Sequence, residues 1–131
     1  MITHFIIPGT PVPWARARTN GKRFFTDPKV RAYKDAIALH AKAAGCKPRK
    51  GPCTLIITAF LPIPASWSKK KQEAALNHSS KPDWDNLGKI VSDALNEIAY
   101  EDDSQVYWAS VKKVYAKNPR LEVTVGYADS L

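Results

Sequence analysis

The sequence is short of cysteine, of long apolar runs and, over most of its length, of negative charge. Its two cysteines, Cys46 and Cys53, form no Cys-x-x-Cys pair, which argues against a disulfide or zinc site and favours a reducing compartment. No apolar run approaches the ~20 residues that a membrane-spanning helix needs. The first residues carry no basic stretch and prolines interrupt them early, which is not typical of a secretory signal. We therefore expect a cytoplasmic protein with no membrane partner.

The shortage of acidic residues is uneven along the chain. Seven of the 12 Asp and Glu residues fall between residues 83 and 103, where Lys89 is the one member of the 20 Lys and Arg residues. The rest of the chain carries 19 basic and 5 acidic side chains, and the formal net charge is +8. Such a charge favours nucleic acid as a partner. A carboxylate cluster in a basic chain suits a protein that holds a divalent cation against a polyanion.

Apolar periodicity, interrupted by Pro and Gly, divides residues 1–131 into the elements of one domain. Strands are expected at 2–7, 54–60, 106–115 and 121–125, and helices at 28–44, 69–76 and 86–98. The segment 54–60 is apolar on both faces, which predicts a central strand. We expect an α+β fold of order β-α-β-α-α-β-β, with helices packed on a mixed sheet.

The first and third helices carry the clearest signals. Asp27 and Pro28 supply a cap and an N1 proline for the first helix, and Gly45 supplies its stop. Its buried stripe is expected to contain Val30, Tyr33, Ile37 and Leu39–Ala41. The third helix has an unbroken apolar face formed by Leu87, Ile90, Val91, Ala94, Leu95 and Ile98.

Between the first strand and the first helix, Pro11 and Pro13 hold an extended loop in which basic and aromatic residues alternate. Its basic residues are Arg16, Arg18, Lys22 and Arg23, and its aromatic residues are Trp14, Phe24 and Phe25. This mixture suits a phosphate backbone with exposed bases beside it. A solvated basic loop over a small aromatic cluster fits the composition equally well, and both interpretations stay open.

The acidic segment contains candidate ligands for Mg²⁺, which prefers hard oxygen donors and keeps positions open for water and phosphate. Asp83 and Asp85 lie just before or at the first turn of the third helix, and Asp102 and Asp103 follow its end. In the structural alternative, one of the first pair caps the helix while the other complements its dipole. The three histidines are expected to be surface or packing residues: His4, His40 and His78.

The motif Lys-Pro-Asp-Trp-Asp-Asn-Leu-Gly-Lys at 81–89, with Asp-Ala-Leu-Asn at 93–96 and Glu-Asp-Asp-Ser-Gln-Val at 101–106, resembles the RusA family of Holliday-junction resolvases from bacteria and their phages. The resemblance extends to Pro-x-Pro-x-x-Arg-x-Arg at 11–18 and Pro-x-x-Trp-Ser-Lys-Lys-Lys at 64–71. It implies a homodimeric endonuclease that uses Mg²⁺, or Mn²⁺ in its place, to nick opposing strands of four-way DNA junctions in recombination and repair. Trp14-Ala15 departs from the family, which often has Lys-Gly there, so a basic contact just before Arg16 is in doubt.

The resemblance also implies roles for individual residues. Asp83, Asp85 and Asp103 would be the catalytic, metal-binding carboxylates, with Asp102 as a candidate fourth ligand. Lys89 would be the catalytic lysine, adding positive charge near the non-bridging oxygens. Because Lys89 lies one helical turn from Asp85, a simple ion pair between them is the alternative. The residues expected to contact DNA are Arg16, Arg18, Lys22, Arg23 and Lys81.

Two other functions stay open: a nuclease for flaps or forks, and a non-catalytic DNA-binding module, which would have no use for four acids that repel phosphate. The position of Asp103 raises a separate question. A helix over 86–98 would be about 20 Å long, and the few residues after it cannot easily return to its start. We expect either a shorter or kinked helix, or a site in which Asp103 comes from the partner subunit of a symmetric dimer.

Overall fold

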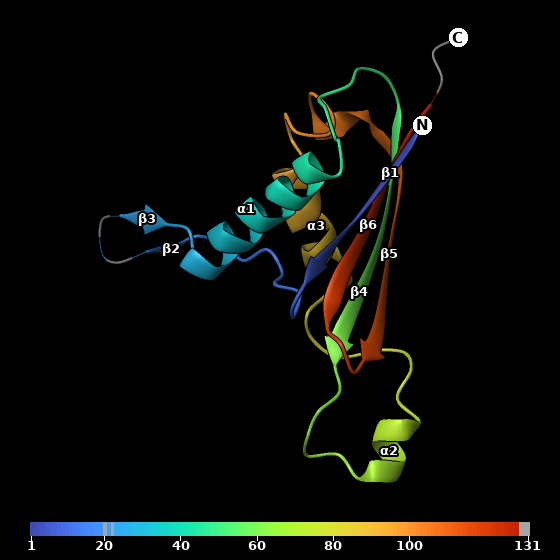
Figure 1. Cartoon of the computed structure of the whole chain (residues 1–131). Coiled ribbons are helices and arrows are strands. Elements are labelled where there is room, and N and C mark those ends of the chain that lie inside the picture. Colours follow the sequence, from blue (N-terminus) through green and yellow to red (C-terminus); the bar gives the residue numbers. More distant parts are fainter. Residues whose placement is uncertain (20, 22, 129–131) are drawn as a thin grey trace.

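The computed structural model describes residues 1–19, 21 and 23–128, and in this part of the chain two helices cover one face of a mixed sheet (Figure 1). The expected α+β class and mixed sheet are confirmed. The elements are β1 (Ile2–Pro8), β2 (Arg18–Thr19), β3 (Phe24–Phe25), α1 (Pro28–Ala43), β4 (Cys53–Pro62), α2 (Lys69–Glu73), α3 (Trp84–Ala94), a 3₁₀ turn (Asp103–Gln105), β5 (Val106–Ala116) and β6 (Arg120–Tyr127).

The main sheet has the strand order β1-β6-β4-β5. β6 is antiparallel to β1 and to β4, whereas β5 is parallel to β4. The prediction that 54–60 is a central strand is therefore confirmed. A parallel pair needs a crossover connection, and the chain from β4 to β5 passes through α2 and α3. This crossover runs back along the sheet, and the acidic segment 83–103 lies within it.

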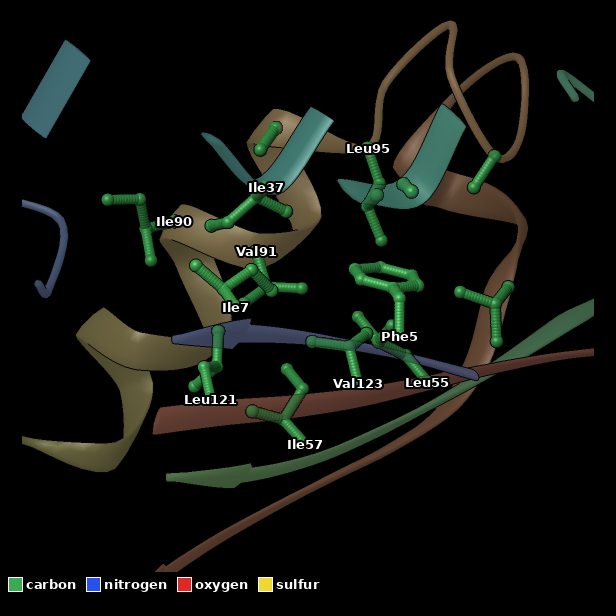
Figure 2. Close-up of a cluster of buried hydrophobic side chains, with 14 of the residues drawn as sticks. Phe5, Ile7, Ile37, Leu55, Ile57, Ile90, Val91, Leu95, Leu121 and Val123 are labelled. Atoms are coloured by element: carbon green, nitrogen blue, oxygen red, sulfur yellow. The ribbon is translucent and has the colours of Figure 1, made fainter. Parts of the chain in front are cut away.

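Alternate residues of the strands form a core with one stripe from each of α1 and α3. Figure 2 shows Leu55 and Ile57 of β4 below Ile37 of α1 and Val91 of α3. On the opposite face of β4, Ile56 is 46% exposed. Apolar residues occupy both faces of β4 as predicted, but the described residues bury one of them. Cys46 and Cys53 are buried free thiols, and burial raises the pKa of both.

The start of α1 follows the sequence signals closely. The Asp27 carboxylate accepts the backbone N–H of Lys29 at 2.8 Å, Pro28 occupies the first turn, and Gly45 adopts a φ of +97° after the helix ends. The prediction for Leu39 was wrong, because this side chain is 66% exposed. Two residues rotate about 200° around a helix, so Leu39 cannot share the buried face of Ile37.

The predicted C-terminal limits of the other two helices were also wrong. α2 ends at Glu73, and α3 ends at Ala94 instead of reaching residue 98. The chain turns after α3: the N–H of Glu97 donates to the carbonyl of Tyr100 at 2.8 Å, and Glu97 has a φ of +64°. The Tyr100 hydroxyl donates back to the carbonyl of Ser92 at 2.8 Å. Because Ile98 packs on the core from this turn, the apolar periodicity outlasts the helix.

A small hairpin changes the predicted order of elements. Arg18–Thr19 and Phe24–Phe25 pair as the antiparallel strands β2 and β3, within a segment that was expected to be a loop. Strands of two residues are too short to show an alternating pattern, so the sequence carried no sign of them. Lys22 lies outside the described residues. No helix in the described part of the chain has the length and apolar character needed to cross a membrane.

Candidate metal and nucleic-acid site at the start of helix α3

A lysine on β5 holds the loop that leads into α3. Lys113 Nζ donates to the carbonyl oxygens of Ser80 at 2.7 Å and Pro82 at 2.8 Å, and the Lys113 carbonyl accepts the N–H of His78 at 3.2 Å. These bonds position the residues immediately before Asp83. Lys113 was not predicted to be a site residue. The sequence did contain one sign of its role: strand alternation places this charged residue on the face of β5 that the helices cover.

A glycine lets α3 approach the same strand closely. A Cβ atom on Gly88 would lie 3.3 Å from Cγ2 of Val111, which is tighter than an ordinary van der Waals contact. The first turns of α3 therefore lie directly against β5, beside the loop that Lys113 holds. This packing brings the motif 81–89 and the middle of β5 into one site.

Asp83 and Asp85 line one open hollow of about 570 Å³, together with Lys81, Trp84 and Lys113. Asp83 occupies the N-cap position of α3, but its side chain makes no capping hydrogen bond. It is 51% exposed and lies 3.6 Å from Nζ of the highly exposed Lys81. The capping role offered as a structural alternative is therefore wrong for Asp83.

Asp85 lies in the first turn of α3, is exposed, and accepts the backbone N–H of Asn86 at 3.0 Å. Its negative charge suits the positive end of the helix dipole, so that alternative role is retained. The same charge is available to a cation, because a carboxylate has further lone pairs beyond the one that Asn86 uses. Asp83 and Asp85 together supply the hard oxygen donors that suit Mg²⁺.

Lys89 lies next to Trp14 on the outer side of α3. Its Nζ is 3.6 Å from Oδ2 of Asp93, one turn along the helix, and 5.0 Å from the centre of the Trp14 ring. The ion pair expected in the alternative interpretation is thus formed with Asp93 and not with Asp85. Trp14 is fixed in place because its backbone N–H donates to the carbonyl of Asn86 at 2.9 Å.

The basic loop leaves the site beside Trp14 and continues into the β2–β3 hairpin, which projects from the domain in Figure 1. Arg16 and Arg23 are exposed, and Phe24 is 80% exposed. The exposure of Phe24 favours the interpretation in which rings are accessible beside basic residues, because this ring belongs to no buried cluster. The side chain of Arg18 lies outside the described residues.

Asp102 and Asp103 lie in a different environment. The Asp102 carboxylate caps the 3₁₀ turn by accepting the N–H of Ser104 at 3.0 Å, and hydrogen bonding to Ser104 lowers the pKa of Asp102. Gln105 Oε1 accepts the N–H groups of Glu101 and Asp102, while its Nε2 donates to the carbonyls of Arg49 and Gly51. Asp102 therefore has the structural role that Asp83 lacks.

The two acidic groups lie at different positions along β5. The loop before Asp83 is bound to Lys113, whereas Asp103 precedes the first residue of the strand, Val106. Lys113 follows Val106 by seven positions, which corresponds to roughly 23 Å of strand at about 3.3 Å per residue. Burial, and after it the negative charge of Asp103, raises the pKa of Tyr100, which places Asp103 near the turn after α3.

A single chain brings Asp83 and Asp85 together but does not bring Asp103 to them. Within the described ranges, no three His, Cys, Asp or Glu side chains gather closely enough to hold one metal ion. The shorter α3 does not remove the separation, because the residues after it stay at the far end of β5 (Figure 1). The assignment of Asp103 as a third ligand stays a prediction.

Sequence similarity extends over almost the whole chain. The model of the family described as endodeoxyribonuclease RusA matches residues 8–126. An uncharacterised protein of Bacillus subtilis (strain 168), YqaN, is 40% identical over 134 residues, which cover 92% of this chain and 93% of YqaN. The crossover junction endodeoxyribonuclease rusA of Lactococcus phage r1t is 33% identical over 85 residues, which cover 64% of this chain and 61% of the phage protein.

Proposed function

The chain belongs to the RusA family of endodeoxyribonucleases, and from that membership we propose that it is a Mg²⁺-dependent enzyme that resolves Holliday junctions by paired nicks in opposing strands. Such an activity serves DNA recombination and repair. The observation that carries the proposal is the pair of carboxylates, Asp83 and Asp85, at the exposed start of a helix in a protein of net charge +8. Carboxylates that repel phosphate have little use in a DNA-binding surface unless a cation lies between them and the backbone.

The donor set of the hollow fits the cation. Asp83 is uncapped and Asp85 keeps lone pairs available, so both can hold Mg²⁺, or Mn²⁺ in its place. When bound there, such an ion supplies a Lewis acid for the phosphate and lowers the pKa of a bound water. Lys113 keeps the loop before Asp83 in position. Lys89, released from Asp93, adds a positive charge for the non-bridging oxygens of the transition state.

Basic residues around the hollow would hold the DNA backbone. Lys81 lines it, and Arg16, Arg18 and Arg23 belong to the loop and hairpin that leave from beside α3. Lys22, which lies outside the described residues, is proposed from the sequence alone to contact the same backbone. Each Lys or Arg that binds a phosphate releases condensed counterions, which supplies affinity that does not depend on sequence. Phe24 on the hairpin offers a ring on which an unpaired base could stack.

A homodimer would complete each metal site. A two-fold axis that sets the α3 helices of two subunits antiparallel places the start of each helix beside the end of the other. Asp83 and Asp85 of one subunit would then share a cation with Asp103 of the partner subunit. This arrangement accounts for the distance of roughly 23 Å along β5 between Lys113, which holds the loop before Asp83, and Val106, which follows Asp103. It also creates two sites, as paired cuts require.

Cleavage of labelled DNA substrates of matched sequence tests the proposal. Wild-type protein with Mg²⁺ should nick a four-way junction symmetrically, should act faster on it than on a flap, fork or linear duplex, and should stop in EDTA. Preferential cutting of flaps or forks would contradict junction resolution and identify the protein as a general branched-DNA nuclease. Binding of junctions without cleavage in either Mg²⁺ or Mn²⁺ would indicate a non-catalytic DNA-binding module.

A further inference from the structure

A mostly apolar cavity of about 660 Å³ adjoins the candidate metal site. Ser80, Lys81 and Asp83 line both this cavity and the acidic hollow, so the two spaces are neighbours. Its remaining walls come from the loop after β1, the end of β4 with the loop that follows it, the segment around His78, the first turn of α3 at Asn86, and β5. The volume lies in the range of pockets that bind small organic ligands, and it exceeds that of one nucleobase.

Flat rings form one wall of this cavity. Trp67 meets Tyr115 edge to face with ring centres 5.1 Å apart, and His78 lies 4.7 Å from the same tyrosine. Lys71 Nζ lies 4.1 Å above the Trp67 ring. The rings are held by the backbone: the Trp67 carbonyl accepts Nε2 of Gln72 at 2.8 Å, and the Tyr115 N–H donates to Leu76 at 2.8 Å. A wall of this kind, with a cation beside it, suits the stacking of a base.

Two polar groups on the cavity have unused hydrogen-bonding capacity. The side-chain amide of Asn86 makes no hydrogen bond among the described residues, although the Asn86 carbonyl accepts the N–H of Trp14. The buried Nδ1 of His78 likewise has no partner there. Burial, and after it the charge of Lys113, lowers the pKa of His78 and so favours the neutral ring. An amide offers a donor and an acceptor together, the combination that reads a base edge.

We propose that this cavity receives the nucleobase next to the phosphate that is cut, with the base stacked against Trp67 and its edge hydrogen-bonded by Asn86. Asn86 would then set the base preference of the nick, and Trp67 would hold the base where Asn86 can read its edge. The inference rests on the proposed function, because Asp83 is the residue that joins the cavity to the cleavage site. Bases at the centre of a junction are less firmly stacked than those of a continuous duplex, which lowers the cost of moving one into the cavity.

The first experiment uses a pool of four-way junctions in which the two nucleotides on each side of the nick are randomised. Wild-type protein should cut a biased subset of the pool. Trp67→Ala should reduce the ratio between favoured and disfavoured bases by roughly tenfold, while Trp67→Phe should keep it. Asn86→Ser should change which base is favoured. Leu39→Ala, which removes an exposed apolar side chain on α1, is the matched control and should behave as wild type.

The second experiment measures base stacking without cleavage. A series of junctions carries one 2-aminopurine at each successive position from the branch point, and the fluorescence of each is read with saturating protein in EDTA. At least one position should respond to wild-type protein and to Leu39→Ala, and should lose most of that response with Trp67→Ala. This readout decides the inference even if wild-type protein cuts no junction, an outcome that would overturn the proposed function.

The inference is overturned if wild-type protein cuts junctions with no base preference beside the nick. It is equally overturned if Trp67→Ala and Asn86→Ser both retain the wild-type preference and fluorescence response. A cavity filled by a side chain of the partner subunit would give that second result together with a weakened dimer in Trp67→Ala.

Discussion

At the start of α3, Asp83 leaves its carboxylate without a capping bond and lines an open hollow, and Lys113 holds the loop before it. Beyond the end of the same helix, Asp102 accepts a backbone N–H of the following turn, and Gln105 bonds four backbone groups around it. Both regions are acidic, and one polar side chain anchors each of them. They differ in what the carboxylate does for the fold: an acid with no local structural role at an anchored position is free to bind a ligand.

The strongest test of this comparison removes charge at the start of α3. Asp83→Asn and Asp85→Asn should each reduce junction cleavage by at least roughly 10²–10³-fold, because each removes an oxygen ligand of the cation. Junction binding should stay intact or become tighter, since one charge that repels phosphate is removed. Asp35→Asn, at an exposed position of α1, is the control. Near-normal cleavage by either variant would remove that residue from the site.

The second test asks whether the two regions meet across a dimer. Asp83→Asn and Asp103→Asn should each be inactive alone, but refolding them together should restore nicking of single strands without paired cuts. In a shared arrangement the heterodimer has one doubly altered site and one intact site. In an arrangement within one subunit, every site carries a lesion. Absence of nicking in a sample shown by mass spectrometry to contain heterodimers contradicts the shared site.

The third test compares the two anchors. Lys113→Met removes two charge-assisted hydrogen bonds to backbone carbonyls and should lower the free energy of unfolding by about 1–3 kcal/mol. It should also slow cleavage, because the loop before Asp83 loses its position. Gln105→Ala should destabilise the fold by a similar amount. Lys112→Met, at the neighbouring exposed position, should change neither quantity.

Urea unfolding and single-turnover cleavage measure both effects of the third test. An Lys113→Met protein with wild-type stability and rate would show that the loop before α3 holds its shape without this lysine. The start of α3 would then have no side-chain anchor comparable to Gln105.

The smallest effect is expected at the basic loop, away from both ends of α3. Arg16→Ala or Arg18→Ala should weaken junction binding and reduce the slope of log K against log salt by roughly one unit for each phosphate that is no longer bound. Lys42→Ala, exposed near the end of α1, serves as the control. Unchanged affinity and slope in both arginine variants would show that the loop is a solvated surface segment that does not bind DNA.

Local signals predicted much of the fold because they act within a few residues. The cap and N1 proline at Asp27 and Pro28 start α1 as expected, and the alternation of 121–125 places Leu121 and Val123 in the core. The apolar character of 54–60 correctly predicted a central strand, although the described residues bury only one of its two faces. The end of α3 was not predictable in this way, because Tyr100 draws the chain into a turn that keeps Ile98 on the core.

The sequence by itself determined the carboxylates, their basic surroundings and the family to which they belong, because these depend on residue type and spacing along the chain. The tertiary structure alone decided that Lys113 anchors the loop before Asp83 and that Trp67 and Asn86 share a cavity with that carboxylate. It also decided that Asp103 lies at the far end of β5. Each of these depends on how the crossover between two parallel strands folds back over the sheet, and contacts between residues so distant in the chain leave no periodic signal in the sequence.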